Sequence, residues 1–347
     1  MDLVHVGKYT KKEGSKMNDK IDFVILWVDG SDPKWLKEKQ KYNPSINVDD
    51  AANRYRDWDN LKYWFRGVEK FAPWVNKIHF VTWGHLPEWL DTTNPKLNIV
   101  NHKDICDKKY LPLFNSSAIE MNINKIKDLS DKFVYFNDDM FIIKKTKKED
   151  FFYNGKPCDE YAETPIETNG KDEIFPHILM NNMTIINKRY NKKSFFKINK
   201  KLYLNFKYGK NLIRTISQIP YRHYTGFYNP HIPQSFKKKY YDDLWIKEKD
   251  KVEVTLNNRF RSKTDITQYV VRYIQLLEGD FCPRKSSFGK IFEISKDNEA
   301  IVKHIIKQNS KVICLNDTDD NIDFDISKKE INDAFEKILG EKSSFEI

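Results

Sequence analysis

Two short acidic segments follow apolar runs and could bind a cation or a phosphate. Asp29-Gly30-Ser31-Asp32 follows the run 21–28, and Asp138-Asp139 follows the run 133–136. Adjacent carboxylates at the end of a strand can share a hard divalent cation, and that cation can also hold a diphosphate. Gly30 would let the backbone approach such a ligand closely. Both segments also have a structural interpretation, because aspartates commonly stabilise turns.

Three further acidic or basic positions have the same two interpretations. Asn316-Asp317 again follows an apolar run, 312–315. Glu120 lies three residues after Ser117, and this capping-box spacing alone favours a structural role. His231 lies between Pro230 and Pro233 in a rigid segment. A rigid histidine that titrates near neutrality suits a general base, although a lone histidine is more often structural.

Arginines could clamp the charge of a diphosphate if they point to the edge of a sheet. Arg66 lies in a segment with helical spacing, and Arg259 and Arg261 flank Phe260 ahead of another such segment. A solvated arginine is the commoner outcome. The sequence contains no P-loop, G-x-G-x-x-G, G-x-S-x-G or H-E-x-x-H motif, which removes the usual support for NTPases, dinucleotide-dependent oxidoreductases and zinc proteases.

The elements that must position these residues follow an alternating pattern. Strands are expected at 21–28, 78–82, 97–100, 133–136 and 312–316, and helices at 58–71, from Ser117 onward, and from Thr264 as N-cap to Leu277. This alternation predicts an α/β fold with a mostly parallel sheet flanked by helices. Ligands bind outside the carboxyl ends of such strands, so the topology should bring Asp29 and Asp138 together.

Composition limits the class of protein. The chain has 347 residues, of which 39% are hydrophobic and 14% aromatic, enough for a sizeable core in one large or two ordinary domains. No run of about 18 apolar residues occurs, so no transmembrane helix is expected. The four cysteines form no C-x-x-C pair, which favours a reduced, cytosolic protein.

The charge is distributed unevenly. The net charge is +10, yet residues 174–241 contain no acidic residue and 14 lysines or arginines. Such a block could face nucleic acid, an anionic lipid or an anionic polymer. Compositional bias of the source genome explains it equally well.

Four segments resemble the conserved regions of the Stealth family. Residues 21–32 resemble the first region, and the stretch from Arg54-Tyr55-Arg56-Asp57 to Asn137-Asp138-Asp139 resembles the second. Residues 222–245 resemble the third region and 313–317 the fourth. The four occur in the family's order and cover most of the chain, which makes the resemblance far more specific than a short motif.

The resemblance implies a function. Stealth proteins transfer a sugar-1-phosphate, usually from a UDP-N-acetylhexosamine, to an acceptor hydroxyl, which forms a phosphodiester and releases UMP. The cofactor is expected to be Mg²⁺ or Mn²⁺, and the acceptor an oligosaccharide or polysaccharide of a capsule or cell surface. We therefore expect a cytoplasmic enzyme with a nucleotide-sugar-transferase-like fold and no nucleic-acid partner. The lysine-rich insertion around 188–214 lies outside the conserved regions, and it would either hold an anionic, phosphodiester-linked acceptor or give peripheral contact with the inner membrane face.

The resemblance also implies roles for individual residues. Asp29, Gly30 and Asp32 would hold the nucleotide-sugar, together with Glu120. His231 would be the base on the acceptor hydroxyl. Arg66 and Arg261 would meet the diphosphate, with Asp265 completing an Arg-x-x-x-Asp feature. The expected metal ligands are Asp138, Asp139 and Asp317, of which Asp139 is the best candidate.

The expected organisation is a polar tail over 1–20, one catalytic domain over 21–320 and a C-terminal helix over 321–347. The domain contains four conserved regions and a basic helical or loop insertion, at about 21–33, 54–150, 220–270 and 311–318, and at about 186–215 for the insertion.

Two rival functions stay open. A glycosyltransferase would attack the anomeric carbon and release UDP instead of UMP. A nucleic-acid-binding module would use the basic, aromatic stretch, as single-strand binders do.

Overall fold

The computed structural model describes residues 20–43, 56–168, 170, 173–317 and 322–347. Almost all of the expected polar tail, Arg54 and Tyr55 of the second region, and residues 318–321 lie outside the described residues.

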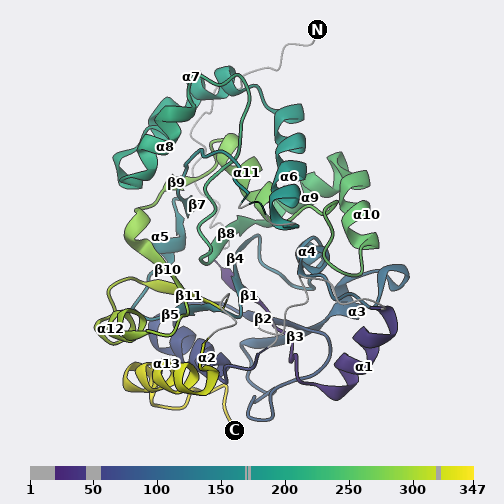
Figure 1. The fold of residues 1–347 in the computed structure, drawn as a ribbon, viewed down its shortest axis with the longest axis vertical. Helices are drawn as coiled ribbons and strands as arrows, with labels where there is room; N and C mark the ends of the chain where they lie inside the picture. The colour runs from purple at the N-terminus through teal and green to yellow at the C-terminus, as the bar shows by residue number, and fades with distance from the viewer. Residues whose placement is uncertain (1–19, 44–55, 169, 171–172, 318–321) are drawn as a thin grey trace.

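A five-stranded sheet forms the centre of the molecule, in the order β3-β2-β1-β4-β8 (Figure 1). The first four strands are parallel, and β8 runs antiparallel to β4. The prediction of an α/β fold with a mostly parallel sheet is therefore confirmed. The strands are β1 (Ile21–Leu26), β2 (Ile78–Thr82), β3 (Leu97–Asn101), β4 (Lys132–Asn137) and β8 (Gln234–Lys237).

Helices cover both faces of this sheet, which explains why β1, β2 and β4 are rich in apolar residues and buried along almost their whole length. Side chains alternate between the faces, so Phe23 and Ile25 enter one core and Val24 enters the other. Helices α2 (Leu61–Phe71) and α13 (Phe324–Leu339) pack into the first core. Helices α6 (Phe175–Arg189), α9 (Lys238–Lys247) and α11 (Tyr269–Leu277) pack into the second.

The order of the strands creates a switch point between β1 and β4. From β1 the chain continues to β2 and β3 on one side, and it then returns to β4 on the other. A crevice at such a point is the usual ligand site of an open parallel sheet. Leu26 pairs with Asn137, so Asp29-Gly30 and Asp138-Asp139 leave the sheet side by side, as predicted.

A second sheet brings the third acidic segment to the same place. Its order is β10-β11-β5, with β5 (Met140–Ile142) starting directly after Asp139. The strand β11 (Val312–Asn316) ends one residue before Asp317 and pairs with β5 through Cys314 and Met140. The remaining strands are β10 (Gly289–Glu293), β6 (Phe152–Tyr153), β7 (Lys156–Asp159) and β9 (Cys282–Pro283).

The expected helices form, but several begin or end elsewhere. The helix expected from Thr264 begins at Tyr269, because Thr264 and Asp265 bind within the preceding loop. Its predicted stop is confirmed, since Gly279 has φ +66° just after the helix. The C-terminal helix ends at Leu339, and the following residues extend to a bridge between Glu346 and Leu90.

The α-helices are α1 (Pro33–Tyr42), α2 (Leu61–Phe71), α3 (His102–Ile105), α4 (Ser116–Glu120), α5 (Lys148–Phe151), α6 (Phe175–Arg189), α7 (Lys192–Tyr203), α8 (Asn211–Gln218), α9 (Lys238–Lys247), α10 (Lys249–Asn257), α11 (Tyr269–Leu277), α12 (Glu299–Lys307) and α13 (Phe324–Leu339). The basic insertion is thus helical and comprises the end of α6, α7 and the start of α8. Among the helices of the described residues, none is both long and apolar enough to cross a bilayer.

Candidate active site

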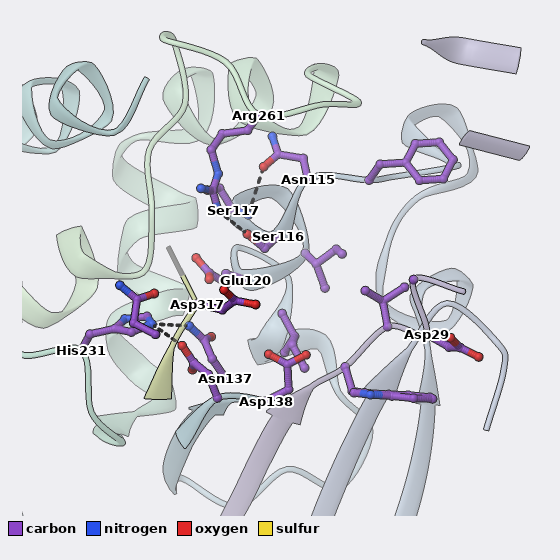
Figure 2. A pocket seen from close by; sticks show the side chains of 18 of the residues that line it. Asp29, Asn115, Ser116, Ser117, Glu120, Asn137, Asp138, His231, Arg261 and Asp317 are labelled. Atoms are coloured by element: carbon purple, nitrogen blue, oxygen red, sulfur yellow. Dashed lines mark hydrogen bonds and ion pairs between the residues drawn. The ribbon is translucent and has the colours of Figure 1, made fainter. Parts of the chain in front are cut away.

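A pocket of about 680 Å³ opens at the carboxyl ends of β1 and β4. In Figure 2, His231 lies at the left of the pocket and Asp29 at the right. Asp138 lies between them at the bottom of the view, and Arg261 lies at the top. The sequence-predicted site residues that line the pocket are Asp29, Gly30, Glu120, Asp138, Asp139, His231, Arg261 and Asp317.

His231 and Asp139 form an ion pair on the pocket wall. His231 Nε2 lies 3.1 Å from Asp139 Oδ2. An ionised carboxylate can only accept, so the imidazole donates Nε2–H and keeps Nδ1 as its proton acceptor. Nδ1 lies 3.5 Å from the Tyr269 hydroxyl. Burial lowers the pKa of His231, but the neighbouring Asp139 carboxylate outweighs it, and the net pKa is raised.

Asp139 has a carboxylate oxygen that is free to accept a cation. Its Oδ1 is buried and has no hydrogen-bond partner among the described residues. Asp139, His231 and Cys314 each place one donor atom within 4.8 Å of the others. Burial raises the pKa of the Cys314 thiol well above its usual range, and its S–H donates to Asp139 Oδ2 at 3.3 Å. In this structure Cys314 thus acts as a hydrogen-bond donor to Asp139.

Asp138 adds a second carboxylate next to Asp139. Its side chain lies on the pocket wall, where solvent can reach it. The protein atoms around the pocket are nevertheless close enough to disfavour its charged form. Burial and the Asp139 charge raise the pKa of Asp138 to about 7. Two adjacent carboxylates that resist simultaneous ionisation, one with an unpartnered oxygen, fit a hard cation such as Mg²⁺ or Mn²⁺.

Asp317 lies in the same pocket but has other partners. Its Oδ2 accepts a hydrogen bond from Trp58 Nε1 at 3.1 Å, and its Oδ1 lies 3.6 Å from Arg56 Nη1. Asp317 is not part of the donor group around Asp139, and its role as a metal ligand stays a prediction.

Asp32 does not line the pocket, which differs from the prediction that it holds the donor itself. It is the N-cap of α1, where its Oδ1 accepts the Lys34 N–H at 2.8 Å. Its Oδ2 lies 2.9 Å from His85 Nδ1, and His85 Nε2 accepts the backbone N–H of Asp29 at 2.7 Å. Asp32 thus fixes the Asp29-Gly30 turn through His85.

Arg66 was predicted to meet the diphosphate, but the structure places it away from the pocket. On α2 it turns toward the C-terminal segment and forms two 2.8 Å hydrogen bonds to the Glu346 carboxylate. It also donates to the Leu339 carbonyl at 3.0 Å. The face of α2 that carries Arg66 packs on α13, so this arginine joins α2 to the C-terminal segment.

Replacing Glu346 with alanine should therefore affect stability more than catalysis. The Arg66 and Glu346 side chains are 9% and 4% exposed, and removing one partner of a buried pair is strongly destabilising. Because Glu336 stays 3.3 Å from Arg66 Nη1 and compensates part of its charge, the loss should be about 2 kcal/mol. Denaturant unfolding measures this loss. As control, Lys329→Ala removes a pair whose side chains are 75% and 59% exposed and should cost under about 0.5 kcal/mol. Equal effects of the two variants would refute this role for Arg66.

Arg261 reaches the pocket from the loop before α11. Its Nη2 donates to Ser116 Oγ at 3.0 Å (Figure 2). Asp265 does not line the pocket; its Oδ2 accepts from Asn115 Nδ2 and from the Ser262 N–H, both at 2.8 Å. The Arg-x-x-x-Asp spacing therefore combines a pocket arginine with the aspartate that anchors its loop to α4.

Glu120 is not part of a capping box. Asn115 is the N-cap of α4, and its side chain accepts the Ser117 N–H at 3.1 Å, which leaves Glu120 at the end of the helix facing the pocket. Burial raises the pKa of Glu120 to about 7. Tyr135 Oη lies 2.9 Å from Glu120 Oε1 and 2.6 Å from Asn137 Oδ1. Since one hydroxyl hydrogen cannot serve both acceptors, a protonated Glu120 completes the network.

Glu120→Gln should stabilise the fold in alkaline buffer, because glutamine mimics the protonated acid. A carboxyl with a pKa of about 7 when folded and about 4.3 when unfolded destabilises the fold progressively as the pH rises between these values. The variant should gain a few kcal/mol near pH 8 and almost nothing near pH 4. Thermal unfolding across this range tests it, and a pH-independent difference would contradict the buried, protonated state.

Sequence reasoning missed polar residues that complete the pocket. Arg56 belongs to the Arg54-Tyr55-Arg56-Asp57 motif that carries the resemblance. Nothing in the spacing of the two arginines indicates that Arg56, and not Arg66, reaches the pocket. Asn115 precedes two serines, a signal for an N-cap that the Ser117 spacing obscured. The missed pocket residues are Arg56, Trp58, Asn115, Ser116, Tyr135, Asn137 and Tyr269.

Comparison with known proteins supports the resemblance. The model of Stealth protein conserved region 1 matches residues 19–46, and that of conserved region 2 matches residues 54–159. Assignment of the third and fourth regions stays a prediction. In the solved structures, the galactosyltransferase LgtC gives a TM-score of 0.38 at 12% identity, covering 90% of this chain and 95% of LgtC.

Curated relatives match along almost the whole chain. The capsular polysaccharide phosphotransferase WcwK of Streptococcus pneumoniae is 44% identical over 334 residues, which cover 95% of this chain and 99% of WcwK. The exopolysaccharide phosphotransferase cps2G of Lactiplantibacillus plantarum is 39% identical, with 94% and 96% covered. The receptor polysaccharide phosphotransferase WefC of Streptococcus gordonii is 37% identical, with 95% and 100% covered. The chain belongs to the Stealth family and is a phosphotransferase.

Proposed function

We propose that this phosphotransferase moves a sugar-1-phosphate from a UDP-sugar to a sugar hydroxyl of an oligosaccharide or polysaccharide, in capsular or cell-surface polysaccharide synthesis. A phosphodiester forms and UMP leaves. One observation carries the proposal: three sequence-distant acidic segments, a histidine and an arginine line one pocket at the switch point of the sheet. The names of the full-length relatives support the class of reaction.

The donor is proposed to bind along the carboxyl ends of β1 and β4. The turn at Asp29 and Gly30 approaches the nucleotide part. Arg261 supplies positive charge to the diphosphate from the α4 side of the pocket. Arg56, already beside Asp317, is the second arginine of the pocket wall. An N-acetylhexosamine is the sugar we expect.

Asp139, with Asp138 beside it, is proposed to hold Mg²⁺ or Mn²⁺. The cation would neutralise charge on the diphosphate oxygens and make UMP a better leaving group. The buried Asp139 Oδ1 without a partner is the observation that supports this assignment.

His231 is proposed to remove the proton of the acceptor hydroxyl. Asp139 accepts its Nε2–H and favours the charged imidazolium that forms, so Nδ1 receives the proton. The attacking hydroxyl oxygen then forms its bond to the β-phosphorus, and the bond from that phosphorus to the UMP oxygen breaks. Displacement at phosphorus depends mainly on positioning and charge neutralisation, which this wall provides.

Product analysis tests the proposal. UDP-N-acetylglucosamine, Mg²⁺ and a capsule-type oligosaccharide are incubated with the protein, and the products are read by mass spectrometry and phosphorus NMR. UMP with a new phosphodiester signal is expected, and a panel of UDP-hexoses then ranks the donors. UDP with a phosphorus-free glycoside would overturn the proposal in favour of a glycosyltransferase.

A further inference from the structure

The helical insertion forms a surface that the reaction proposed above does not use. The helices α7 and α8 lie together at one end of the long axis of the molecule, joined through a 3-10 turn at Phe206–Tyr208 (Figure 1). None of the residues 192–218 lines the pocket.

The polarity of α8 is inverted. Asn211 and Thr215 are buried; the Asn211 amide donates to Glu160 at 2.7 Å, and the Thr215 hydroxyl accepts the Glu163 N–H at 3.1 Å. Leu212 packs partly against the core, but the other two apolar side chains of the helix face outward, with Ile213 70% and Ile216 50% exposed. A surface helix normally buries its apolar face. The reversed arrangement needs a partner for that face.

Exposed apolar side chains continue on both sides of α8. On the 3-10 turn Phe206 is 91% exposed, and on α7 Ile198 is 77% exposed. Beyond α8, Ile219 and Tyr221 are 42% and 55% exposed. Aliphatic and aromatic side chains of this size rarely gather in solvent within one short stretch of a monomeric protein.

Basic side chains surround these apolar residues. No acidic residue occurs from 174 to 241, so no carboxylate of this segment offsets the positive charge. Within residues 192–218 the exposed basic residues are Lys193, Lys197, Lys200, Lys201, Lys207, Lys210 and Arg214. We call these residues, with Ile198, Phe206, Ile213 and Ile216, the α7–α8 surface.

We propose that the α7–α8 surface docks the enzyme on an anionic lipid bilayer. The basic side chains attract anionic headgroups, and the apolar side chains enter the boundary between headgroups and acyl chains. A nucleic acid or a soluble anionic polymer would explain the lysines but not the outward isoleucines. Single-strand binding relies on stacked aromatic rings, and three of the four apolar residues in the surface are aliphatic. This proposal names the residues of the expected membrane contact and does not rest on the proposed reaction.

Vesicle flotation of the full chain tests the proposal. Phosphatidylcholine vesicles with and without phosphatidylglycerol are compared, and binding is expected only with the anionic lipid. Combining Phe206→Ser, Ile213→Ser and Ile216→Ser should lower the partition coefficient by about tenfold or more. Lys207→Ser with Lys210→Ser should lower it about fivefold for each lysine removed.

Exposed isoleucines elsewhere provide matched controls. Ile246 on α9 is 79% exposed and Ile326 on α13 is 58% exposed, so Ile246→Ser and Ile326→Ser should float like the parent. The apolar triple variant should keep the parent's turnover of a short soluble acceptor, which separates docking from the reaction. Absence of flotation, flotation unaffected by the triple variant, or equal losses in the controls would each overturn the proposal. Loss of binding in the lysine variant alone would instead indicate an electrostatic site for a soluble polyanion.

Discussion

Replacing His231 with alanine is expected to lower kcat by about 10²- to 10⁴-fold, because the acceptor hydroxyl loses its general base. The imidazole lies on the pocket wall, and Asp139 fixes its orientation through a 3.1 Å contact. The donor would still contact Arg261 and the turn at Asp29, so KM for the UDP-sugar should change much less than kcat. Steady-state release of UMP measures both constants.

His223→Ala is the matched control for this experiment. His223 lies in the same segment of the chain, is exposed and does not line the pocket. Its replacement should leave kcat and KM close to those of the parent. If the His231→Ala variant retained near-complete turnover with intact stability, the assignment of the base would be wrong.

Asp139→Asn should have an effect of at least about 10³-fold on kcat, because one side chain serves two parts of the mechanism. The change removes the negative charge that pairs with His231 Nε2. It also leaves one side-chain oxygen, instead of two, to bind the cation, next to the buried position of Oδ1. Binding of Mn²⁺ to the protein without donor, measured by electron paramagnetic resonance, should weaken in parallel. This second measurement separates loss of the cation from a general loss of activity.

Asp131→Asn is the control for the removal of a negative charge next to β4. Asp131 is exposed at the opposite end of β4, next to its first residue. The control should bind Mn²⁺ and turn over like the parent. Unchanged Mn²⁺ affinity in the Asp139→Asn variant, or full activity of the parent in excess chelator, would contradict the metal assignment.

The central sheet was predictable because its strands are buried on both faces. A strand in that position is a short, mostly apolar run. β1, β2 and β4 all show one, interrupted only by Asp22 in β1 and His79 in β2 before the strands reach their polar ends. Parallel pairing then places Asp29 beside Asp138 without any knowledge of side-chain contacts. β8 could not be found this way, since Gln234–Lys237 is an antiparallel strand with no such run.

Local spacing rules failed where distant contacts decide the role of a residue. Glu120 has the spacing of a capping box from Ser117, yet Asn115 caps the helix and Glu120 turns to Tyr135 in the pocket. Arg66 was expected at the diphosphate, but its carboxylate partner Glu346 lies 280 residues away in sequence. No periodicity within α2 can reveal that contact.

The destination of the donor's β-phosphorus distinguishes sugar-1-phosphate transfer from glycosyl transfer. A UDP-sugar radiolabelled at the β-phosphate is supplied with acceptor and Mg²⁺, and label is followed in the nucleotide and in the saccharide product. Our account predicts that the label leaves the nucleotide completely, enters the acceptor as a phosphodiester and is matched by an equal amount of unlabelled UMP. Label retained in UDP, with an unlabelled glycoside as the other product, would contradict it.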